Sequence, residues 1–174
     1  LFQSIKDTDI VIHLAELVGD PLCALRPENT YKTNFLSTLA ISNICKNLKI
    51  EKFIYFSSCS VYGASLNEKI LKETSSLNPV SIYAKIKLMC EKAIMQNADT
   101  FFNPTIIRLG TVFGYSPRMR LDLVVNILVY NALNFKKIKI NGGDQWRPFV
   151  HLEDISEAVI KIILSRKLNT QKRI

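Results

Sequence analysis

The sequence predicts an α/β fold with a doubly wound parallel sheet. Short β-branched and apolar runs at 9–14, 52–57 and 104–109 are typical of strands buried on both faces. Two longer segments between them, at 28–48 and 81–97, carry apolar residues at helical spacing. Connections of this length imply right-handed crossovers between parallel strands, with helices covering the sheet.

The first half of the chain follows this plan in order. Residues 1–9 (LFQSIKDTD) have the pattern of a helix end that runs into a strand. The elements expected after it are a strand at 9–14, a loop with Gly19, Pro21 and Pro27, a helix from Glu28 to about Leu48, a strand at 52–57, and an aperiodic stretch at 63–80 whose Asn78-Pro79 favours a loop before the helix at 81–97.

The second half is expected to be built from shorter elements. Gly110 and Gly114 mark a turn after the strand at 104–109, and Asp154 suits the first turn of the last helix. The elements expected here are a helix at 121–133, a short strand at 137–140, a glycine turn at 141–143, a strand at 149–151 and a helix at 153–164.

Composition limits the class of protein. A chain of 174 residues that is 48% apolar suits one globular domain, and no apolar run approaches the roughly 18–20 residues of a membrane span. The scattered basic residues behind the formal charge of +8 favour solvated surface over a phosphate-bearing ligand or weak nucleic-acid contact. Without C-x-x-C spacing, the cysteines predict reduced thiols, a cytoplasmic location and no structural metal; they are Cys23, Cys45, Cys59 and Cys90.

The stretch PVSIYAKIK, at 79–87, contains a candidate acid/base pair. In a helix Tyr83 and Lys87 lie on one face, whereas Lys85 points elsewhere. A phenol has a pKa near 10, and an ammonium within about 4–6 Å lowers it toward the working range. Ser58, at the end of the neighbouring strand, would hold a substrate alcohol while Tyr83 removes its proton and a hydride leaves for a nicotinamide. The Y-x-x-x-K spacing alone is weak, because both residues are common on helix surfaces.

Six segments in order give a stronger signal. The chain resembles the extended short-chain dehydrogenase/reductases, specifically the NAD-dependent epimerase/dehydratase family that acts on nucleotide sugars, in DIVIHLAE, NFLSTLAISNICK, KFIYFSSCSVYG, NPVSIYAKIKLMCEK, PTIIRLGTVFG and GGDQWRPFVHLEDISEAV. The resemblance implies a Rossmann-like fold, NAD as cofactor with NADP left open, a nucleotide-sugar substrate, and a homodimer paired through helices 28–48 and 81–97. It also implies a partial cofactor-binding and catalytic domain at 1–115 and a substrate-binding region at 116–174 that is interleaved with the last Rossmann elements.

The same resemblance assigns roles to individual residues. Ser58 corresponds to the catalytic hydroxyl, Tyr83 to the acid/base, and Lys87 to its partner, which also bonds the nicotinamide ribose. Arg147 matches an arginine on the nucleotide diphosphate, where a guanidinium fork suits phosphate oxygens. The remaining expected contacts are His13, Leu14, Ala15, Asn34 and Ser57 on the cofactor side, and Cys59, Ser60 and Thr111 on the substrate side.

Several of these residues also have structural interpretations. Cys59 is a candidate proton donor in epimerisation or an inert thiol. The structural interpretations of the other residues are a turn cap for Ser58, a packed strand-end histidine for His13, an ordinary helix residue for Asn34, and a surface ion pair with Asp144 or Glu153 for Arg147.

The chain departs from the family at four places. The glycine-rich turn that cradles the pyrophosphate is not among these residues, so we expect a fragment that begins in mid-domain, in preference to a truncated protein. Cys59 and Ser60 replace the Asp-Glu of sugar 4,6-dehydratases, which disfavours a dehydratase. Thr111 stands where isomerising members often have asparagine, and Glu16 where the family commonly has alanine, beside the nicotinamide.

Two functions remain from the sequence. The favoured one is an NAD(P)-dependent nucleotide-sugar epimerase or related oxidoreductase that works through a transient keto-sugar with Ser58, Tyr83 and Lys87. The alternative is a non-catalytic or truncated family member that serves as a dinucleotide- or macromolecule-binding module. Direct nucleic-acid binding is a weaker possibility and predicts salt-sensitive affinity.

Overall fold

The computed structural model describes residues 1–63, 70–140, 142–143 and 146–165. The chain forms two compact units, Leu1–Arg108 and Leu109–Leu164, which are described separately. This boundary follows contacts within the chain, whereas the division expected at residue 115 follows family function and stays a prediction.

The first unit is built on a parallel sheet. Its strands β1 (Ile10–His13), β2 (Lys52–Ser58) and β3 (Thr105–Leu109) lie in the order β1-β2-β3. Parallel pairing puts Ile10 opposite Lys52 and His13 opposite Tyr55. Residues 53–57 of the central strand are all buried, as expected for an apolar strand between two neighbours. The predicted α/β class with parallel strands is confirmed.

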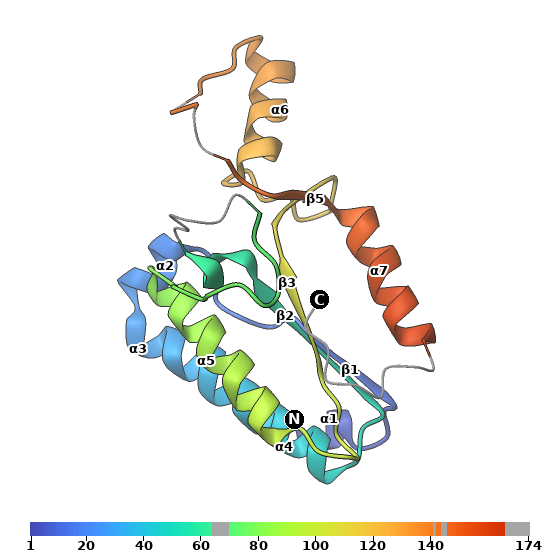
Figure 1. The fold of residues 1–174 in the computed structure, drawn as a ribbon. Coiled ribbons are helices and arrows are strands. Elements are labelled where there is room, and N and C mark those ends of the chain that lie inside the picture. The colour runs from blue at the N-terminus through green and yellow to red at the C-terminus, as the bar shows by residue number, and fades with distance from the viewer. Residues whose placement is uncertain (64–69, 141, 144–145, 166–174) are drawn as a thin grey trace. The chain divides into compact units, whose positions relative to one another are not determined.

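Helices cover one face of this sheet (Figure 1). A short α1 (Phe2–Ile5) precedes β1, and the connection from β1 to β2 contains α2 (Asp20–Leu25), α3 (Pro27–Thr30), a π-helical segment (Tyr31–Leu36) and α4 (Ser37–Asn47). A 3-10 turn (Cys59–Tyr62) follows β2, and α5 (Ile82–Asn97) precedes β3. The core beneath α4 and α5 includes Cys45, Phe53, Tyr55, Cys90, Ile94, Phe102 and Ile106.

The prediction of a loop around Gly19, Pro21 and Pro27 is wrong over part of this segment, because helix α2 forms there. Proline fits the first turn of a helix, since its fixed φ is helical and its missing N–H has no partner to lose. Asp20 adds a carboxylate at the positive end of the same short helix. The helices predicted at 28–48 and 81–97 are confirmed, and Ser81 caps α5 by accepting the Ala84 N–H at 3.1 Å.

The second unit contains two strands and two helices. Strand β4 (Thr111–Phe113) pairs in parallel with β5 (Phe149–His151), and α6 (Val124–Phe135) and α7 (Leu152–Leu164) complete the unit. The approach of these strands requires glycine at 110, because a Cβ there would lie 2.9 Å from the Pro148 carbonyl oxygen.

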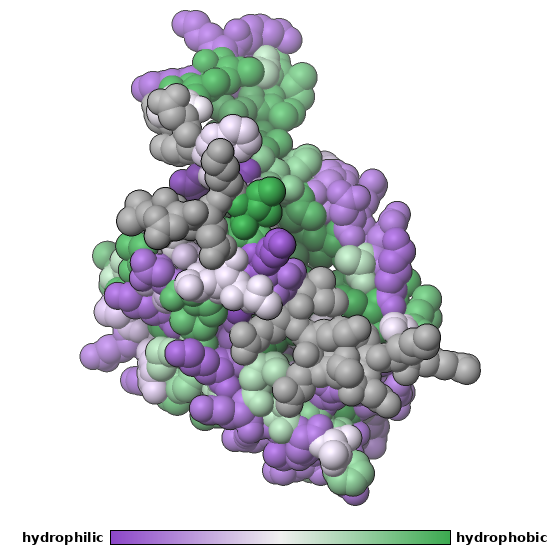
Figure 2. Space-filling view, in the orientation of Figure 1, coloured by the Kyte–Doolittle hydropathy of each residue, from purple (hydrophilic) through white to green (hydrophobic). Residues whose placement is uncertain are grey.

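Two predictions for this unit fail. Residues 137–140 form no strand, since Ile138 and Ile140 are exposed and these residues pair with no strand in the described part of the chain. The sequence predicts a turn at the position where strand β4 forms. The strand could not be recognised, because three residues between two glycines are too short to show a period of two. Figure 2 shows hydrophobic surface over α6, where the exposed side chains include Val129, Tyr130, Leu133 and Phe135.

Two features of the composition can be compared with the structure. All four cysteines are free thiols, and three of them are buried. Among the described helices, none has the length and apolar character needed to cross a membrane.

Candidate active site

Ser58 lies where β2 ends and the 3-10 turn begins. Its Oγ accepts the Ser60 backbone N–H at 3.2 Å and lies 2.5 Å from the Ser60 Oγ. The serine therefore caps the turn, as its structural interpretation requires. Its side chain also acts on Tyr83: burial raises the pKa of the Tyr83 phenol, and hydrogen bonding to Ser58 lowers it in part.

Helix α5 carries both Tyr83 and Lys87, and its lysines differ in burial. Lys87 is 5% exposed, whereas Lys85 is exposed to solvent. The Lys87 Nζ lies 5.7 Å from the centroid of the Tyr83 ring. Because α5 begins at the Ser81 cap, Tyr83 is in its first turn and Lys87 one turn later. The prediction that these two residues share a helix face, with Lys85 elsewhere, is confirmed.

The charge of Lys87 is balanced by Glu16, which follows β1. The Lys87 Nζ lies 2.5 Å from the Glu16 Oε2, and the Glu16 side chain is 2% exposed. The other Glu16 oxygen accepts the Tyr55 hydroxyl at 2.6 Å. Lys87 also donates to the Phe56 carbonyl and lies 4.8 Å from the centroid of the Tyr55 ring. The ammonium is thus held inside a closed polar cluster.

This cluster opposes the expected effect of Lys87 on Tyr83. Burial raises the pKa of the Tyr83 phenol, the charge of Glu16 raises it further, and hydrogen bonding to Ser58 lowers it only in part. The expectation that Lys87 lowers the Tyr83 pKa stays a prediction, and the contact of its ammonium with Glu16 at 2.5 Å acts against it. Sequence analysis noted Glu16 as a departure from the family but missed it as the partner of Lys87.

Two predicted cofactor-side residues support the end of β1. His13 is 5% exposed, and its Nε2 lies 2.8 Å from the Thr38 Oγ1. Burial, with a smaller contribution from Lys87, lowers the pKa of His13 to about 4, so the ring is neutral at pH 7. Asn34 accepts the Leu17 N–H and donates to the Leu17 carbonyl, both at 2.8 Å. Asn34 thereby fixes the segment that carries Glu16.

The remaining predicted residues of the first unit differ in exposure. Leu14 is 61% exposed and Ala15 is exposed, so both are open to a ligand at the end of β1. Cys59 and Ser60 are half-buried beside Ser58. Ser57 is buried and donates its hydroxyl to the Glu91 Oε1 at 2.6 Å, so its side chain belongs to a second network.

That second network centres on an ion pair between Glu91 and Arg108. Arg108 donates from Nε to the Glu91 Oε1 at 2.9 Å and from Nη2 to the Glu91 Oε2 at 2.6 Å. Its Nη1 donates to the Tyr62 hydroxyl at 3.1 Å. Sequence analysis missed this pair, although an arginine inside an apolar strand and a glutamate four residues after Lys87 on α5 both indicate buried charge.

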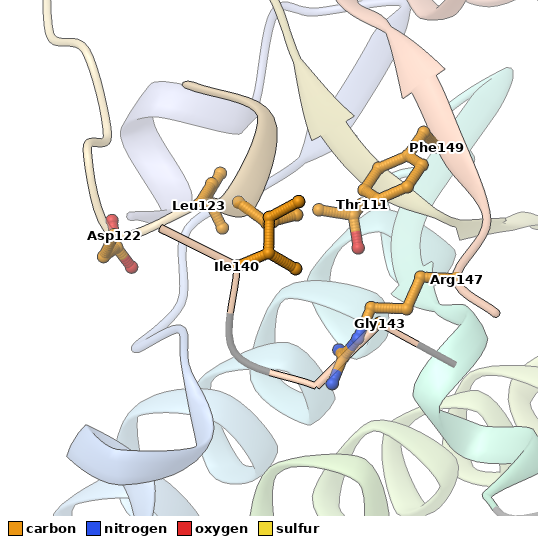
Figure 3. Close-up of a pocket in the computed structure, with 8 residues that line it drawn as sticks. Thr111, Asp122, Leu123, Ile140, Gly143, Arg147 and Phe149 are labelled. Carbon is orange, nitrogen blue, oxygen red and sulfur yellow. The ribbon is translucent and has the colours of Figure 1, made fainter. Parts of the chain in front are cut away.

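A separate cavity lies within the second unit. Its volume is about 450 Å³, and it is lined by Thr111, Asp122, Leu123, Val124, Ile140, Gly143, Arg147 and Phe149. Figure 3 shows Leu123 and Ile140 between Asp122 on one side and Arg147 with Phe149 on the other. The two predicted substrate residues of this unit, Thr111 and Arg147, therefore line one cavity.

The charges around this cavity favour an anion. Asp122 is paired with Arg120 at 2.5 Å, and hydrogen bonding to Arg120 lowers the pKa of the Asp122 carboxyl. Glu153, one suggested partner of Arg147, instead lies 3.7 Å from the His151 Nδ1, and Asp144 lies outside the described residues. Arg147 is exposed at the cavity, where its planar fork is suited to phosphate oxygens.

A tyrosine hydroxyl whose pKa responds to a serine hydroxyl, with an ammonium one helical turn away, suits proton exchange with an alcohol. Metal chemistry has no comparable support, since the described residues contain no group of three His, Cys, Asp or Glu side chains placed to hold a metal ion. The model of the NAD dependent epimerase/dehydratase family matches residues 1–174. The chain belongs to this family.

Two curated relatives have the names of enzymes that act on nucleotide sugars. The chain is 31% identical to dTDP-D-glucose 4,6-dehydratase of Dictyostelium discoideum, over 86% of the chain and 37% of that protein. It is 28% identical to the uncharacterized UDP-glucose epimerase YtcB of Bacillus subtilis, over 94% of the chain and 51% of that protein. The chain therefore spans about half or less of the length of these curated relatives.

Solved structures of the family share the fold. UDP-glucuronic acid 4-epimerase from Bacillus cereus, in complex with UDP-glucuronic acid and NAD, aligns with a TM-score of 0.87 at 28% identity, over 99% of the chain and 55% of that protein. MoeE5 in complex with UDP-glucuronic acid and NAD aligns with a TM-score of 0.84 at 26% identity, over 95% of the chain and 56% of that protein. The Rossmann-like fold expected from the resemblance is thereby confirmed.

Proposed function

We propose that the protein is an NAD-dependent enzyme that oxidises one hydroxyl of a nucleotide sugar to a transient ketone, as an epimerase or a related oxidoreductase. The observation that carries this proposal is the placement of Tyr83 and Lys87 on one face of α5, with the Lys87 Nζ 5.7 Å from the centroid of the Tyr83 ring and with Ser58 at the end of β2 acting on the pKa of the phenol. Membership of the family supports the reaction class.

The residues around the end of β1 fit the nicotinamide end of NAD. Leu14 and Ala15 are exposed there and offer apolar surface to a flat ring. Lys87 supplies ammonium donors of the kind that bind ribose hydroxyls. When bound, NAD accepts a hydride from the sugar carbon and returns it later. NADP stays an alternative, since the adenosine end would contact none of the residues named here.

The proton follows a route through the side chains of the chain itself. Ser58 would hold the substrate hydroxyl, and Tyr83, as the phenolate, would accept the hydroxyl proton as the carbon–oxygen bond becomes a carbonyl. The hydride would leave from the same carbon with both electrons of its C–H bond, so the sugar loses that hydride and the hydroxyl proton, and the proton stays on Tyr83. When the hydride returns, Tyr83 gives the proton back, and return to the opposite face of the ketone inverts the carbon.

The cavity of the second unit supports a nucleotide-linked substrate. Arg147 and the Thr111 hydroxyl suit the oxygens of a diphosphate, and the apolar side chains Leu123, Ile140 and Phe149 suit the remainder of a nucleotide. Cys59 and Ser60, beside Ser58, would contact the sugar. Because they replace the Asp-Glu of 4,6-dehydratases, epimerisation is favoured over loss of water.

Location and assembly are further parts of the proposal. The four free thiols suit a reducing cytoplasm. A homodimer paired through α4 and α5 is expected from the resemblance. The mass of the protein in solution tests this expectation.

The direct experiment supplies NAD and a panel of UDP- and dTDP-sugars to the purified protein. We expect one nucleotide sugar to be converted to its epimer, or to a ketone with transient absorbance of reduced nicotinamide. The corresponding free sugar, without the nucleotide, is the control and should not react. Failure of every nucleotide sugar in a protein that binds NAD would contradict the proposal.

A second candidate, a non-catalytic dinucleotide-binding module, is favoured by one observation. The charge of Lys87 is neutralised by Glu16, and the Tyr83 phenol is correspondingly less acidic than a free phenol. A protein that binds NAD with unchanged affinity in the Tyr83→Phe variant, and shows no turnover in either form, would establish this candidate instead.

A further inference from the structure

Glu16 is a buried carboxylate whose two oxygens are both in contact with the candidate site. One oxygen lies 2.5 Å from the Lys87 ammonium, and the other accepts the Tyr55 hydroxyl at 2.6 Å. Both charged side chains of the pair are nearly inaccessible, at 6% exposure for Lys87 and 2% for Glu16. A carboxylate buried this deeply is retained only when its charge is compensated, so the position of Lys87 and that of Glu16 depend on each other.

We propose that Glu16 is a positioning residue of this site, which holds Lys87 in an ion pair and controls how much of the ammonium charge acts on Tyr83. The inference rests on the proposed function of Tyr83 as the acid/base. It concerns a residue that differs from the family pattern, so it describes a property of this chain.

The groups that face Tyr83 come from three elements. Lys87 lies on α5 with Tyr83, and Ser58 ends β2. The segment between β1 and α3 contributes Glu16, Asp20 and Cys23, all of which oppose formation of a phenolate. Of these three groups, Glu16 raises the pKa of Tyr83 the most, and Cys23 and Asp20 raise it less.

The groups that face Glu16 complete the cluster. Tyr55 donates to it from β2, and Cys90 on α5 and Cys23 on α2 are thiols whose pKa values are raised by burial first and by Glu16 in addition. Lys87 is the cation in direct contact with it. Glu16 therefore supplies the negative charge of the cluster, and the positive charge of Lys87 balances it.

The consequence is a phenol that keeps its proton over a wider range of pH, because burial and the charge of Glu16 disfavour the phenolate. With Glu16 charged, the substrate alcohol meets Tyr83 as a protonated phenol until the pH is high or Lys87 is released from the pair. Removal of the Glu16 charge should lower the pKa of Tyr83 and move the rising limb of the pH–rate profile to lower pH. A charge within about 4–6 Å shifts a pKa by about one to three units, so we expect a shift of about one unit or more.

The test is direct titration of Tyr83 in the protein labelled with ¹³C at the tyrosine Cζ, with the Tyr83 signal assigned from its loss in Tyr83→Phe. In Glu16→Gln the phenolate should appear at a pH about one unit or more below that of the wild type. Glu28→Gln is the matched control, because Glu28 is an exposed glutamate of the same connection, and it should leave the titration unchanged.

Two further variants guard against a trivial loss of folding. Glu16→Ala introduces the residue common in the family and should shift the titration in the same direction. Glu16→Asp keeps the charge and should return the titration toward the wild-type pH. The rising limb of kcat against pH should move with the phenolate signal, with little change in KM.

The outcomes separate this inference from the proposed function. An identical Tyr83 titration in the wild type, Glu16→Gln and Glu16→Ala would overturn the positioning role, whatever the turnover. A shifted titration in proteins that convert no nucleotide sugar would leave the role of Glu16 standing and overturn the proposed reaction.

Discussion

Helix α5 contributes to two buried ion pairs of contrasting design. In one, Glu91 receives two hydrogen bonds from the Arg108 fork, at 2.6 and 2.9 Å, and a third from Ser57. In the other, Lys87 approaches a single oxygen of Glu16 at 2.5 Å. The first pair joins α5 to β3 along a rigid planar contact, and the second joins α5 to the segment after β1 through a point charge.

The difference lies in the geometry of the contact between cation and carboxylate. Burial by itself lowers the pKa of Arg108, but hydrogen bonds with Glu91 and Tyr62 and the charge of Glu91 raise it overall, so this cation stays charged. Lys87, in contrast, contacts Glu16 as a point charge without a planar fork. The two charge pairs on one helix thus differ in geometry, and the lysine pair is the one that adjoins the candidate acid/base.

The largest expected effect comes from breaking the arginine pair. Arg108→Met leaves Glu91 buried without its cation, and we expect the free energy of unfolding to fall by about 3–5 kcal/mol. Urea denaturation followed by circular dichroism measures the change. Lys85→Met, at an exposed lysine of α5, is the control and should lie within about 0.5 kcal/mol of the wild type.

Removing the carboxylate of the lysine pair should cost less. In Glu16→Gln a single contact to a charged oxygen is lost, so we expect a loss of about 1–3 kcal/mol, against a larger loss in Glu91→Gln, where the carboxylate that accepts two hydrogen bonds from Arg108 is removed. The two variants are compared by the same denaturation at pH 7. Equal losses would mean that the two pairs do not differ in the way proposed here.

His13 gives an independent measure of the charge on Lys87. Its pKa is lowered to about 4 by burial and then by Lys87, whereas an unfolded histidine titrates near 6.5. Below pH 6.5 the unfolded chain therefore binds the extra proton, and stability falls as the pH drops toward 4.

We expect this histidine to account for about 2 kcal/mol of lost stability between pH 7 and pH 5. The measurement is the difference between those two pH values in the wild type and in His13→Gln, with His151→Gln as control. If His13→Gln and the wild type lose the same stability over this range, the histidine is not held neutral.

Arg147 extends the comparison to an arginine exposed at a cavity. Arg147→Ala should raise KM for a nucleotide sugar by about tenfold or more with little change in kcat, since a diphosphate contact is present in the ground state and the transition state alike. Arg147→Lys should restore affinity only in part, because an ammonium lacks the fork. Arg118→Ala, an exposed arginine of the same unit, should leave KM unchanged.

The sequence could predict those parts of the fold that repeat over a long enough stretch. Strand β2 and helices α4 and α5 are well defined in the sequence because burial imposes a period or an unbroken apolar run. The short α2 and β4 were missed because six and three residues carry too little pattern.

The candidate site was predictable in its local part only. Tyr83 and Lys87 are one turn apart, so helical geometry alone brings them together. The pairing of Lys87 with Glu16 depends on the register of β1 with β2, which sets His13 opposite Tyr55 and brings the following glutamate to the end of the sheet. No local pattern contains this register, and for this reason the charge of Glu16 beside Lys87 and Tyr83 could not be predicted from the sequence.

The proposed role of Tyr83 is tested most directly by turnover of the Tyr83→Phe variant with NAD and the nucleotide sugar that the wild type converts. Loss of the phenol should reduce kcat by about 10²–10⁴-fold while the fold and NAD affinity are kept. Tyr31→Phe, at an exposed tyrosine before α4, is the matched control and should retain wild-type kcat. Full turnover in a folded Tyr83→Phe protein would contradict the assignment of Tyr83 as the acid/base.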